Sequence, residues 1–382
     1  MSEQEKILVA MSGGVDSAVS ALLLKEEGYD VTGINLRVFE YDSSCKSDRS
    51  CCSPEDIRDA GNTALSMDIP FYVIKMEEEF KKRVIDRFKL DYSAARTPNP
   101  CVECNTFIKF GSLLEKARGL GIEKIATGHY AKIRRLENGR WCIADGADRV
   151  KNQSYYLYGL SQSAIASTLF PLGNMVKSEV REIARKNGLP VAEKKESQEI
   201  CFIPENDYRT FLKREGVRFT PGFFKTESGE ILGEHNGREQ FTIGQRRGLG
   251  IAYSDPLYVI RIDLNGDVIV ATEERTENFI FRIEQFNFQG LDPEFFKKDH
   301  INQPYPCKIQ IRYRSEPVRA EIRYIGYSHT ISWNGNPEGD LIQVTMIDHA
   351  FSVTPGQSAV IYSSEENSDI AGSVLAGGII SR

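Results

Sequence analysis

The sequence predicts an α/β protein: a doubly wound parallel sheet, followed by two smaller β-rich modules of which the last is a β-barrel. An apolar run near the N-terminus passes through a glycine-rich turn into a helix. Strand-like and helix-like segments then alternate to about residue 130, as in a parallel sheet with crossover helices. From about residue 215, short strands separated by glycine turns indicate small barrels or sandwiches.

Composition bounds the possible classes of protein. The 382 residues fit two or three domains, and 41% hydrophobic with 27% charged residues is typical of a soluble globular chain. No run of ~18 apolar residues occurs, so we expect no membrane span. The polar N-terminus leads directly into a strand, so we expect no signal or transit peptide and a cytoplasmic location. The net charge of −6 argues against indiscriminate nucleic-acid binding but allows a local basic patch.

The first strand, Ile7 to Met11, is followed by Ser-Gly-Gly-Val-Asp-Ser at 12–17 and then by apolar residues at helical spacing up to Gly28. The N–H groups of such a turn, together with the helix N-terminus, bind anions and above all phosphate. The glycines allow the backbone to approach a phosphate closely, and both serines could add hydroxyl donors. Asp16 could hold Mg²⁺ beside the phosphates.

This turn is neither a Walker A sequence, which needs Gly-Lys-Ser/Thr, nor a Rossmann GxGxxG. Ser-Gly-Gly-Val-Asp-Ser resembles the PP-loop of the N-type ATP pyrophosphatases. The resemblance implies that ATP is cleaved between its α- and β-phosphates, that a carbonyl oxygen is adenylated, and that pyrophosphate is released.

The remaining elements follow the same alternation. Ligands of doubly wound sheets lie outside the carboxyl ends of the strands, so we expect the PP-loop, Leu36 and Gly128 to meet there. The two prolines within 96–105 predict an irregular loop. Strands are predicted at 30–38, 69–74 and 124–130, helices from about residue 54, over 77–92 and over 107–120, and mainly helix over 150–200. The predicted domains are 1–208 (PP-loop catalytic domain), 209–276 (central β-rich domain) and 277–382 (C-terminal β-barrel).

Eight cysteines in a cytosolic chain favour catalytic, redox or metal-binding roles over structural disulfides. Cys101 and Cys104 form a CxxC, and Cys201 lies in Ser-Gln-Glu-Ile-Cys-Phe. A lone CxxC can mark zinc, a redox pair or chance, and no second CxxC or HxxxH completes a zinc site. Beside a PP-loop, the cysteines favour a reaction in which ATP converts a carbonyl oxygen into a leaving group and sulfur replaces it. The helix after Asn105 is expected to lend its N-terminal dipole to the Cys104 thiolate.

The other cysteines and histidines give weaker signals. His129, after a glycine at a strand end, is the one histidine that we expect to be functional. We expect exposed loop thiols at Cys45, Cys51 and Cys52, core residues at Cys142 and Cys307, and surface or turn histidines at His235, His300 and His349.

Nine motifs occur in order along nearly the whole chain. They are Ser-Gly-Gly-Val-Asp-Ser, Thr-Pro-Asn-Pro-Cys-Val-Glu-Cys-Asn, Ile-Lys-Phe-Gly, Ala-Thr-Gly-His-Tyr, Asn-Gln-Ser-Tyr-Tyr-Leu, Ser-Gln-Glu-Ile-Cys-Phe-Ile, Thr-Ile-Gly-Gln-Arg-Arg-Gly-Leu-Gly, Ile-Arg-Tyr-Arg and Val-Thr-Pro-Gly-Gln. The set is similar to the tRNA-specific 2-thiouridylases of the MnmA/TrmU type.

The resemblance implies ATP-dependent 2-thiolation of a tRNA wobble uridine, with Mg²⁺ and a sulfur-donor protein, either a persulfide relay or a cysteine desulfurase. It implies that Cys104 is the nucleophile and that Cys201 carries a transient persulfide. The implied ATP contacts are Ala10, Met11, Ser12, Gly13, Gly14, Val15, Asp16, Ser17, Leu36 and Gly128. The implied target-base contacts are Asn99, Pro100 and Cys101, and the implied tRNA contacts are His129, Lys151, Asn152, Gln153, Arg312, Tyr313 and Gln357.

Two positions depart from the usual family pattern. Relatives often carry Met at the Leu36 position, and some carry Asp at the Cys101 position. A cysteine at 101 leaves open an iron–sulfur cluster held by Cys101, Cys104 and Cys201. Two alternative functions also stay open: another PP-loop ATP pyrophosphatase of the amidotransferase or synthetase type, and a non-catalytic RNA-binding or sulfur-carrier protein.

Overall fold

The computed structural model describes residues 4–39, 53–195, 200–203, 207–272, 279–328, 339–348, 352–364 and 369–381. The chain divides into two compact units. The first unit is formed by Met1–Ile85 with Pro100–Asp207, and the second by Asp86–Asn99 with Tyr208–Arg382. Among the described residues, none of the helices has the length and apolar character needed to cross a membrane.

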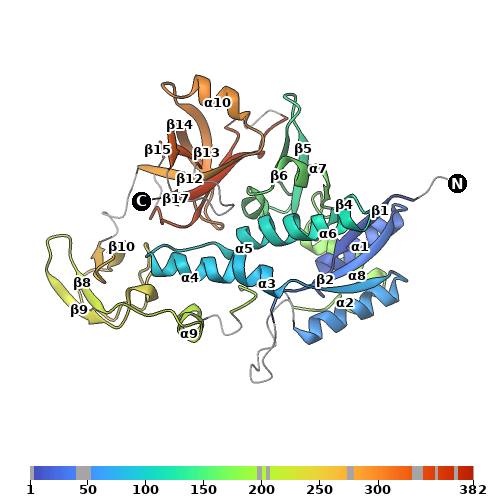
Figure 1. Ribbon diagram of the computed structural model, residues 1–382, viewed down its shortest axis with the longest axis horizontal. Helices are drawn as coiled ribbons and strands as arrows, with labels where there is room; N and C mark the ends of the chain where they lie inside the picture. Colours follow the sequence, from blue (N-terminus) through green and yellow to red (C-terminus); the bar gives the residue numbers. More distant parts are fainter. Residues whose placement is uncertain are drawn as a thin grey trace. The chain divides into compact units, whose positions relative to one another are not determined.

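The first unit contains a five-stranded parallel sheet with strand order β3-β2-β1-β4-β7, drawn in Figure 1. The central strand β1 pairs with β2, where Lys6 lies opposite Asp30, and with β4, where Ile7 lies opposite Lys124. The predicted doubly wound parallel sheet is therefore confirmed. Its strands are β1 (Lys6–Ala10), β2 (Asp30–Arg37), β3 (Phe71–Lys75), β4 (Lys124–Ala126) and β7 (Thr168–Leu169).

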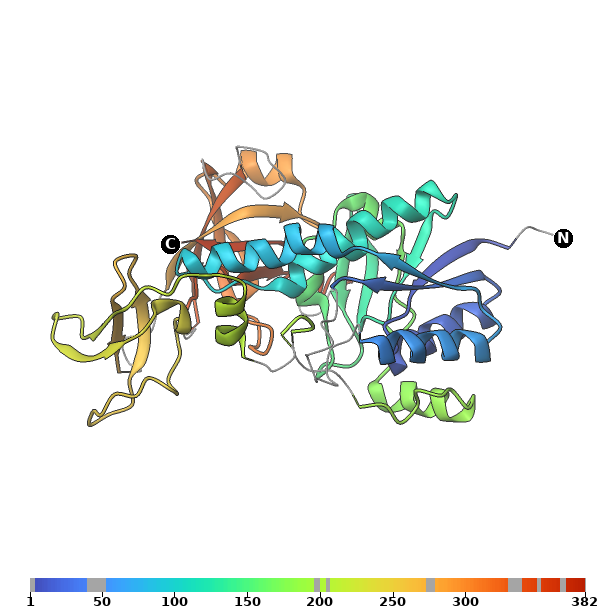
Figure 2. The same ribbon diagram turned by 60° about the horizontal axis from the view of Figure 1, so that its bottom comes forward.

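Helices cover both faces of this sheet, as Figures 1 and 2 show. Helix α1 (Val15–Glu26) packs against α2 (Pro54–Ser66) and α8 (Lys177–Lys186) on one face, and α6 (Leu113–Gly119) contacts β4 on the other. Every second side chain of a strand lies on the same face of the sheet, so Ile7 and Val9 of β1 pack together in the core that α1 covers. Helix α2 begins at a capping box, in which Ser53 and Asp56 satisfy each other's backbone N–H groups.

The predicted helix over 77–92 is present, but it contains a π-helical turn. It runs through α3 (Glu77–Phe80), the π segment η1 (Lys81–Ile85) and α4 (Asp86–Ser93). The predicted irregular loop over 96–105 is wrong in its second half, where α5 (Pro100–Glu103) continues into the π segment η2 (Cys104–Ser112). Proline at the first position of a helix loses no hydrogen bond, so Pro100 starts a helix instead of preventing one.

A hairpin follows β4, and the segment predicted as mainly helical over 150–200 is less helical than expected. An antiparallel hairpin pairs β5 (Ala131–Arg135) with β6 (Trp141–Asp145), and Cys142 within it is buried, as predicted. The helical pieces that follow are η3 (Ser154–Leu157) and α7 (Gln162–Ala166).

The second unit contains two β structures. A four-stranded sheet has the order β10-β11-β8-β9, and a closed six-stranded barrel has the order β12-β15-β14-β13-β16-β17 (Figure 1). The predicted C-terminal β-barrel is therefore confirmed. Besides α4, its elements are α9 (Tyr208–Arg214), β8 (Gly222–Lys225), β9 (Ile231–His235), η4 (Arg238–Gln240), β10 (Tyr258–Ile262), β11 (Val268–Ala271), β12 (Ile280–Phe288), α10 (Pro293–Asp299), β13 (Tyr305–Gln310), β14 (Val318–Ser328), β15 (Gly339–Met346), β16 (Ser358–Tyr362) and β17 (Val374–Ser381).

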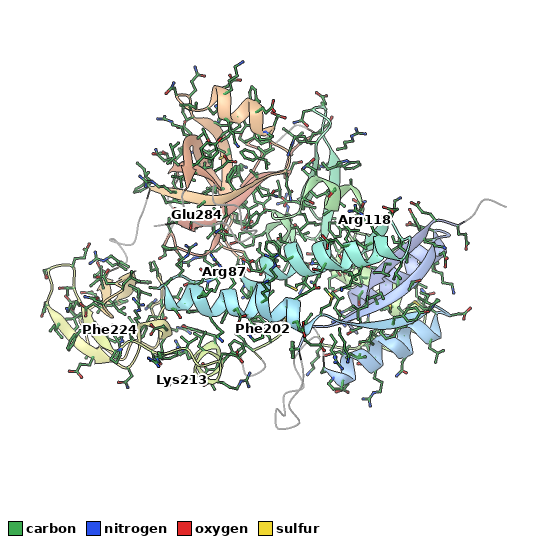
Figure 3. The ribbon with its side chains drawn as sticks, in the orientation of Figure 1. Arg87, Arg118, Phe202, Lys213, Phe224 and Glu284 are labelled. Carbon is green, nitrogen blue, oxygen red and sulfur yellow. The ribbon has the colours of Figure 1, made fainter. Side chains whose placement is uncertain are left out.

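The second unit contains Cys307, which was predicted to be a core residue, and His235, which was predicted to be a surface or turn residue. Cys307 is buried in the barrel core, as predicted. His235 is also buried, with its ring 4.9 Å from that of Phe224, labelled in Figure 3, and 5.0 Å from that of Phe241. The predicted surface or turn position of His235 is therefore wrong, because this imidazole completes an aromatic cluster. Cys45, Cys51, Cys52 and His349 lie outside the described residues.

The barrel core provides a test of the fold. Ile283 on β12 is fully buried. We expect Ile283→Ala to lower the free energy of unfolding of the barrel by about 2–5 kcal/mol, and Ile283→Val by about 0.5–1.5 kcal/mol, because the larger deletion leaves the larger cavity. Thermal denaturation of both variants checks this, and equal, small shifts in Tm would contradict the packing.

Candidate active site

The PP-loop joins β1 to α1, and its geometry requires glycine. Gly13 has φ +78°, and a Cβ there would lie 2.3 Å from the Asp56 carbonyl oxygen at the start of α2. Gly14 is the N-cap of α1 and has no side chain to cap the helix. The first N–H groups of α1 therefore have no side-chain oxygen from the N-cap bound to them, as a phosphate site requires.

The two loop serines differ in their roles. Ser17 Oγ accepts a hydrogen bond from the Ser12 N–H (3.2 Å) and donates one to the Gly14 carbonyl (3.0 Å). Ser17 is buried and holds the turn closed, so its hydroxyl proton is already used by the backbone. Ser12 is exposed and remains the better candidate for a hydroxyl donor to a ligand.

Asp16 binds a cation that the sequence analysis missed. Lys177 Nζ lies 2.7 Å from one carboxylate oxygen of Asp16 and 2.8 Å from the other, and the Tyr130 hydroxyl donates to the same carboxylate at 2.7 Å. Lys177 thus places a cation beside a loop that has no lysine of its own. A weak signal for it was present in the sequence, since Lys177 opens a helix, where the macrodipole disfavours a cation.

The carboxyl ends of the central strands meet at this loop. A Cβ on Gly128 would lie 2.7 Å from the Asp16 carbonyl carbon and 2.8 Å from the Ser17 nitrogen, so only glycine fits there. On the other side, Asn35 Nδ2 donates to the Met11 carbonyl at 2.8 Å, directly before Leu36. The PP-loop, Leu36 and Gly128 therefore lie together at the carboxyl ends of β1, β2 and β4.

Lys194 is a second missed residue near the loop. Its Nζ lies 2.6 Å from an Asp56 carboxylate oxygen and also contacts Asp59, both on α2. These contacts hold Lys194, which precedes Cys201 in the sequence, against α2. The same helix contacts Gly13 through the Asp56 carbonyl. No sequence spacing joins Lys194 to α2, because the partners lie 138 and 135 positions apart.

The two catalytic candidates, Cys104 and Cys201, are both half-buried, whereas Cys101 is exposed. Phe202 packs edge-on against Phe80 of α3, with 5.7 Å between ring centroids, and Figure 3 shows its label beside α3. Phe107 of η2 lies under the Arg83 guanidinium of η1, 5.2 Å from its ring centroid. The structure thus brings both cysteine segments to one helical stretch, 77–85.

The expected source of Cys104 activation is wrong. Because the helix begins at Pro100, Cys104 lies beyond its first turn, where the dipole effect has faded, and Cys101 lies within that turn. Cys104 instead opens the π segment η2. Such π turns are frequent at functional sites.

Among the described residues, no three His, Cys, Asp or Glu side chains gather as a metal-binding group. Cys101, Cys104 and Cys201 are all described, so this structure does not assemble them into a cluster site.

The predicted tRNA-contact residues of the first unit make internal contacts. His129 is buried, its Nδ1 lies 2.6 Å from Thr127 Oγ1, and its ring lies 5.8 Å from those of Phe110 and Phe170. Burial, with the charge of Lys109, holds the pKa of His129 well below its usual value, so the ring is neutral near pH 7.

The other predicted tRNA contacts of this unit follow the β5–β6 hairpin, at Lys151, Asn152 and Gln153. Asn152 Nδ2 donates to Asp145 Oδ1 at 2.7 Å, and Gln153 Oε1 accepts from the Tyr130 N–H at 3.0 Å. Lys151 is half-buried. Gln153 therefore supports the backbone of Tyr130, whose hydroxyl bonds to Asp16.

The predicted tRNA-contact residues of the second unit also have protein partners. Arg312 Nη2 donates to the Ser352 carbonyl (3.0 Å) and to Thr354 Oγ1 (3.3 Å). Gln357 Nε2 donates to the carbonyls of Thr97 (3.0 Å) and Pro98 (3.3 Å). Tyr313 is half-buried beside Arg312.

Comparison with known proteins identifies the family. Residues 5–205 match the family profile described as tRNA methyl transferase HUP domain, 209–272 the tRNA methyl transferase PRC-barrel domain, and 280–380 the aminomethyltransferase beta-barrel domain. The tRNA-specific 2-thiouridylase MnmA of Leptospira biflexa is 56% identical to the chain, covering 100% of it and 96% of the relative.

The chain belongs to the family of tRNA-specific 2-thiouridylases of the MnmA type. Two further 2-thiouridylases agree: that of Leptospira interrogans is 55% identical, covering 99% of this chain and 95% of the relative, and that of Geotalea uraniireducens is 42% identical, covering 99% and 96%. The resemblance drawn from the nine motifs is confirmed. The roles of individual residues stay predictions.

The Lys177–Asp16 pair generates a test of the nucleotide site. We expect Lys177→Ala to reduce ATP–pyrophosphate exchange by ~10²–10³-fold, since a preorganised charge at the phosphates is lost. Lys186→Ala, on the exposed end of the same helix, is the matched control and should leave the exchange rate unchanged. An unchanged rate of ATP–pyrophosphate exchange in Lys177→Ala would mean that the Lys177–Asp16 pair serves only to attach α8 to α1.

The buried His129 generates a pH prediction. Because its folded pKa is lowered, the unfolded chain binds a proton near pH 6.5 that the folded protein does not. Its contribution to stability is therefore present above that pH and is lost as the pH falls. We expect the free energy of unfolding to fall less between pH 7.5 and 5.5 in His129→Asn than in the unsubstituted protein, by up to about 1.4 kcal/mol per pH unit. Thermal denaturation at both pH values measures this as a smaller loss of Tm. Equal losses in both proteins would contradict a neutral buried ring.

Proposed function

We propose that this protein is an ATP-dependent tRNA-uridine 2-sulfurtransferase that thiolates the wobble uridine of tRNA at C2. One observation carries the proposal: the unit that holds the phosphate-binding loop also brings two half-buried cysteine segments onto a single helical stretch. Relatives spanning the whole chain are named for the same activity. The division into 1–208, 209–276 and 277–382, with tRNA bound by the last, belongs to this proposal.

ATP is the first substrate, and its phosphates lie at the PP-loop, from Ala10 to Ser17, with Leu36 and Gly128 beside them. The uridine C2 oxygen attacks the α-phosphorus, pyrophosphate leaves, and an O-adenylated base results. The leaving group at C2 is then AMP instead of oxide. Asp16 is the residue that would hold Mg²⁺, which neutralises phosphate charge when bound. Lys177 and Tyr130 keep that carboxylate oriented.

Sulfur transfer uses Cys104 and Cys201. A sulfur-donor protein, either a persulfide relay or a cysteine desulfurase, charges Cys201 as a persulfide. The Cys104 thiolate either attacks the inner sulfur, forming a Cys104–Cys201 disulfide and releasing hydrosulfide, or adds to the activated carbon itself and expels AMP. In that second route the outer sulfur of the persulfide displaces Cys104 from C2, and the Cys104 thiolate then attacks the inner sulfur, which releases the 2-thiouridine and leaves the Cys104–Cys201 disulfide. In the first route hydrosulfide attacks C2 and AMP leaves, and a thiol reductant must then reopen the disulfide.

The iron–sulfur alternative would use Cys101, Cys104 and Cys201 as ligands. Since these three side chains do not form a metal-binding group in the structure, we assign no step to a cluster. Asn99 and Pro100 with Cys101 are proposed to lie against the target base. His129, Lys151–Gln153, Arg312, Tyr313 and Gln357 are proposed to support tRNA binding.

Two other functions are separated by one experiment. Another PP-loop ATP pyrophosphatase would exchange pyrophosphate into ATP without tRNA, and a non-catalytic RNA-binding or sulfur-carrier protein would not exchange it at all. We expect exchange that depends on added tRNA and a product tRNA that contains 2-thiouridine.

The cysteines generate the sharpest test. We expect Cys104→Ser and Cys201→Ser to adenylate tRNA normally but to form no 2-thiouridine, because each route needs both sulfurs. Cys101→Ser is the matched variant within the same helix, and it should retain thiolation if no cluster is required. Release of AMP and mass spectrometry of digested tRNA separate the two steps. A Cys201→Ser protein that still makes 2-thiouridine from a persulfide-loaded donor would overturn the persulfide route.

A further inference from the structure

One short segment of the first unit, 148–153, is bonded to both residues whose side chains hold Asp16. The segment follows the β5–β6 hairpin. One end of it bonds to the backbone of Lys177, and the other end bonds to the backbone of Tyr130. The Lys177 ammonium and the Tyr130 hydroxyl both contact the Asp16 carboxylate. All of these residues belong to the same compact unit.

Asp148 takes the place of a missing helix cap. The N-cap residue of α8 is Val176, whose side chain offers no oxygen to the first N–H groups of the helix. Asp148 Oδ2 accepts the hydrogen bond of the Lys177 N–H instead, at 2.9 Å, from 29 positions earlier in the chain. Its negative charge also offsets the unfavourable placement of a lysine at a helix N-terminus. Asp148 therefore fixes the backbone from which the Lys177 side chain reaches Asp16.

The same carboxylate fixes the turn that leads to Gln153. Asp148 Oδ1 accepts hydrogen bonds from the N–H groups of Val150 (3.0 Å) and Lys151 (3.1 Å). Aspartate commonly closes a turn in this way, by bonding to the backbone two residues further on. The two oxygens of one carboxylate thus hold the start of α8 and the loop that follows the hairpin.

Both backbone polar groups of Tyr130 bind Gln153. The Gln153 N–H donates to the Tyr130 carbonyl at 2.9 Å, and the Tyr130 N–H donates to Gln153 Oε1 at 3.0 Å. Gly146 packs against the same carbonyl, since a Cβ there would lie 2.7 Å from the Tyr130 oxygen. The Tyr130 side chain is buried, so the position of its hydroxyl at Asp16 follows the position of this backbone.

We propose that Asp148 and Gln153 are positioning residues for the nucleotide site, an inference that rests on the proposed binding of ATP at the PP-loop. Asp148 sets the place of the Lys177 ammonium. Gln153 sets the place of the Tyr130 hydroxyl. Together these two groups orient the Asp16 carboxylate. A hydrogen bond to a charged group changes an equilibrium constant by about ten- to hundredfold, so its loss is measurable as weaker nucleotide binding.

This role differs from contact with RNA at the same loop. Gln153 Oε1 already accepts from the Tyr130 N–H. A residue that acted only as an RNA contact would not change how the protein binds a nucleotide when no RNA is present. Nucleotide binding without tRNA therefore distinguishes the two roles of Gln153.

The test measures the Kd of the full-length protein for α,β-methylene-ATP with excess Mg²⁺ and without tRNA, by isothermal titration calorimetry. This analogue cannot be cleaved between its α- and β-phosphates. Gln153→Met keeps the approximate length of the side chain but removes the acceptor for the Tyr130 N–H, and we expect it to raise the Kd about tenfold. In Gln153→Glu a carboxylate oxygen can accept the same hydrogen bond. We expect its Kd to stay within about threefold of the unsubstituted value, because one added charge at a partly exposed position is screened.

Gln162→Met is the matched control, because Gln162 Oε1 also accepts from a backbone N–H of the hairpin. Its partner is Trp141, whose N–H lies 2.8 Å away and whose carbonyl accepts from Gln162 Nε2 at 2.9 Å. Trp141 pairs with Arg135, at the end of the hairpin away from Tyr130. We expect Gln162→Met to bind the analogue as the unsubstituted protein does.

If Gln153→Met lowers Tm by more than ~5 °C, Asp148→Asn carries the test. Asparagine has one acceptor oxygen, so it cannot bind both the Lys177 N–H and the loop. Removal of a negative charge by itself favours the binding of an anionic nucleotide. A Kd raised about tenfold in Asp148→Asn therefore reports the loss of positioning.

An unchanged Kd in the variant tested would overturn the proposal, and so would an equal rise of the Kd in Gln153→Glu or Gln162→Met. If the unsubstituted protein binds the analogue but makes no 2-thiouridine, the proposed function fails, while the Kd values still decide whether Gln153 positions Asp16. An unsubstituted protein that does not bind the analogue would overturn the inference together with the nucleotide site.

Discussion

The ion pair between Lys177 and Asp16 is the interaction that joins α1 to α8 beside the PP-loop. A lysine at the first position of a helix is opposed by the helix dipole, so Lys177 needs a carboxylate partner nearby. Asp16 provides it from the first turn of α1, and the Tyr130 hydroxyl donates to one of the two carboxylate oxygens that Lys177 contacts. The pair joins α1 to α8 across 161 positions of sequence and places a cation beside a loop that has none of its own.

Local chemistry explains why the sheet and loop could be predicted. Gly13 and Gly14 interrupt an apolar strand, and the positive φ of Gly13 and the contact with Asp56 confirm that glycine was needed there. Lys177 and Lys194 could not be found in the same way, because a single lysine creates no periodic pattern. Their function depends on partners more than a hundred residues away.

The errors near Cys104 have a similar physical origin. The two prolines within 96–105 predict irregular structure, but Pro100 lies at the one helical position that proline favours. Because the helix begins at Pro100, its N-terminus lies before Cys101, and Cys104 is too far along the helix to gain the stabilisation expected from the helix dipole. The buried ring of His235 was missed because aromatic partners on β8 and after η4 come together only in the folded sheet.

The same packing limits how sulfur can move. Cys201 is adjacent in sequence to Phe202, which is buried against Phe80, and Lys194 ties the preceding chain to α2. Cys201 therefore has a fixed neighbour on its C-terminal side, and a large displacement would require Phe202 to leave its contact. A persulfide extends the side chain by one S–S bond of about 2 Å without moving the backbone. In the proposed persulfide route, this extension moves the outer sulfur of Cys201 while the Phe202–Phe80 contact stays intact.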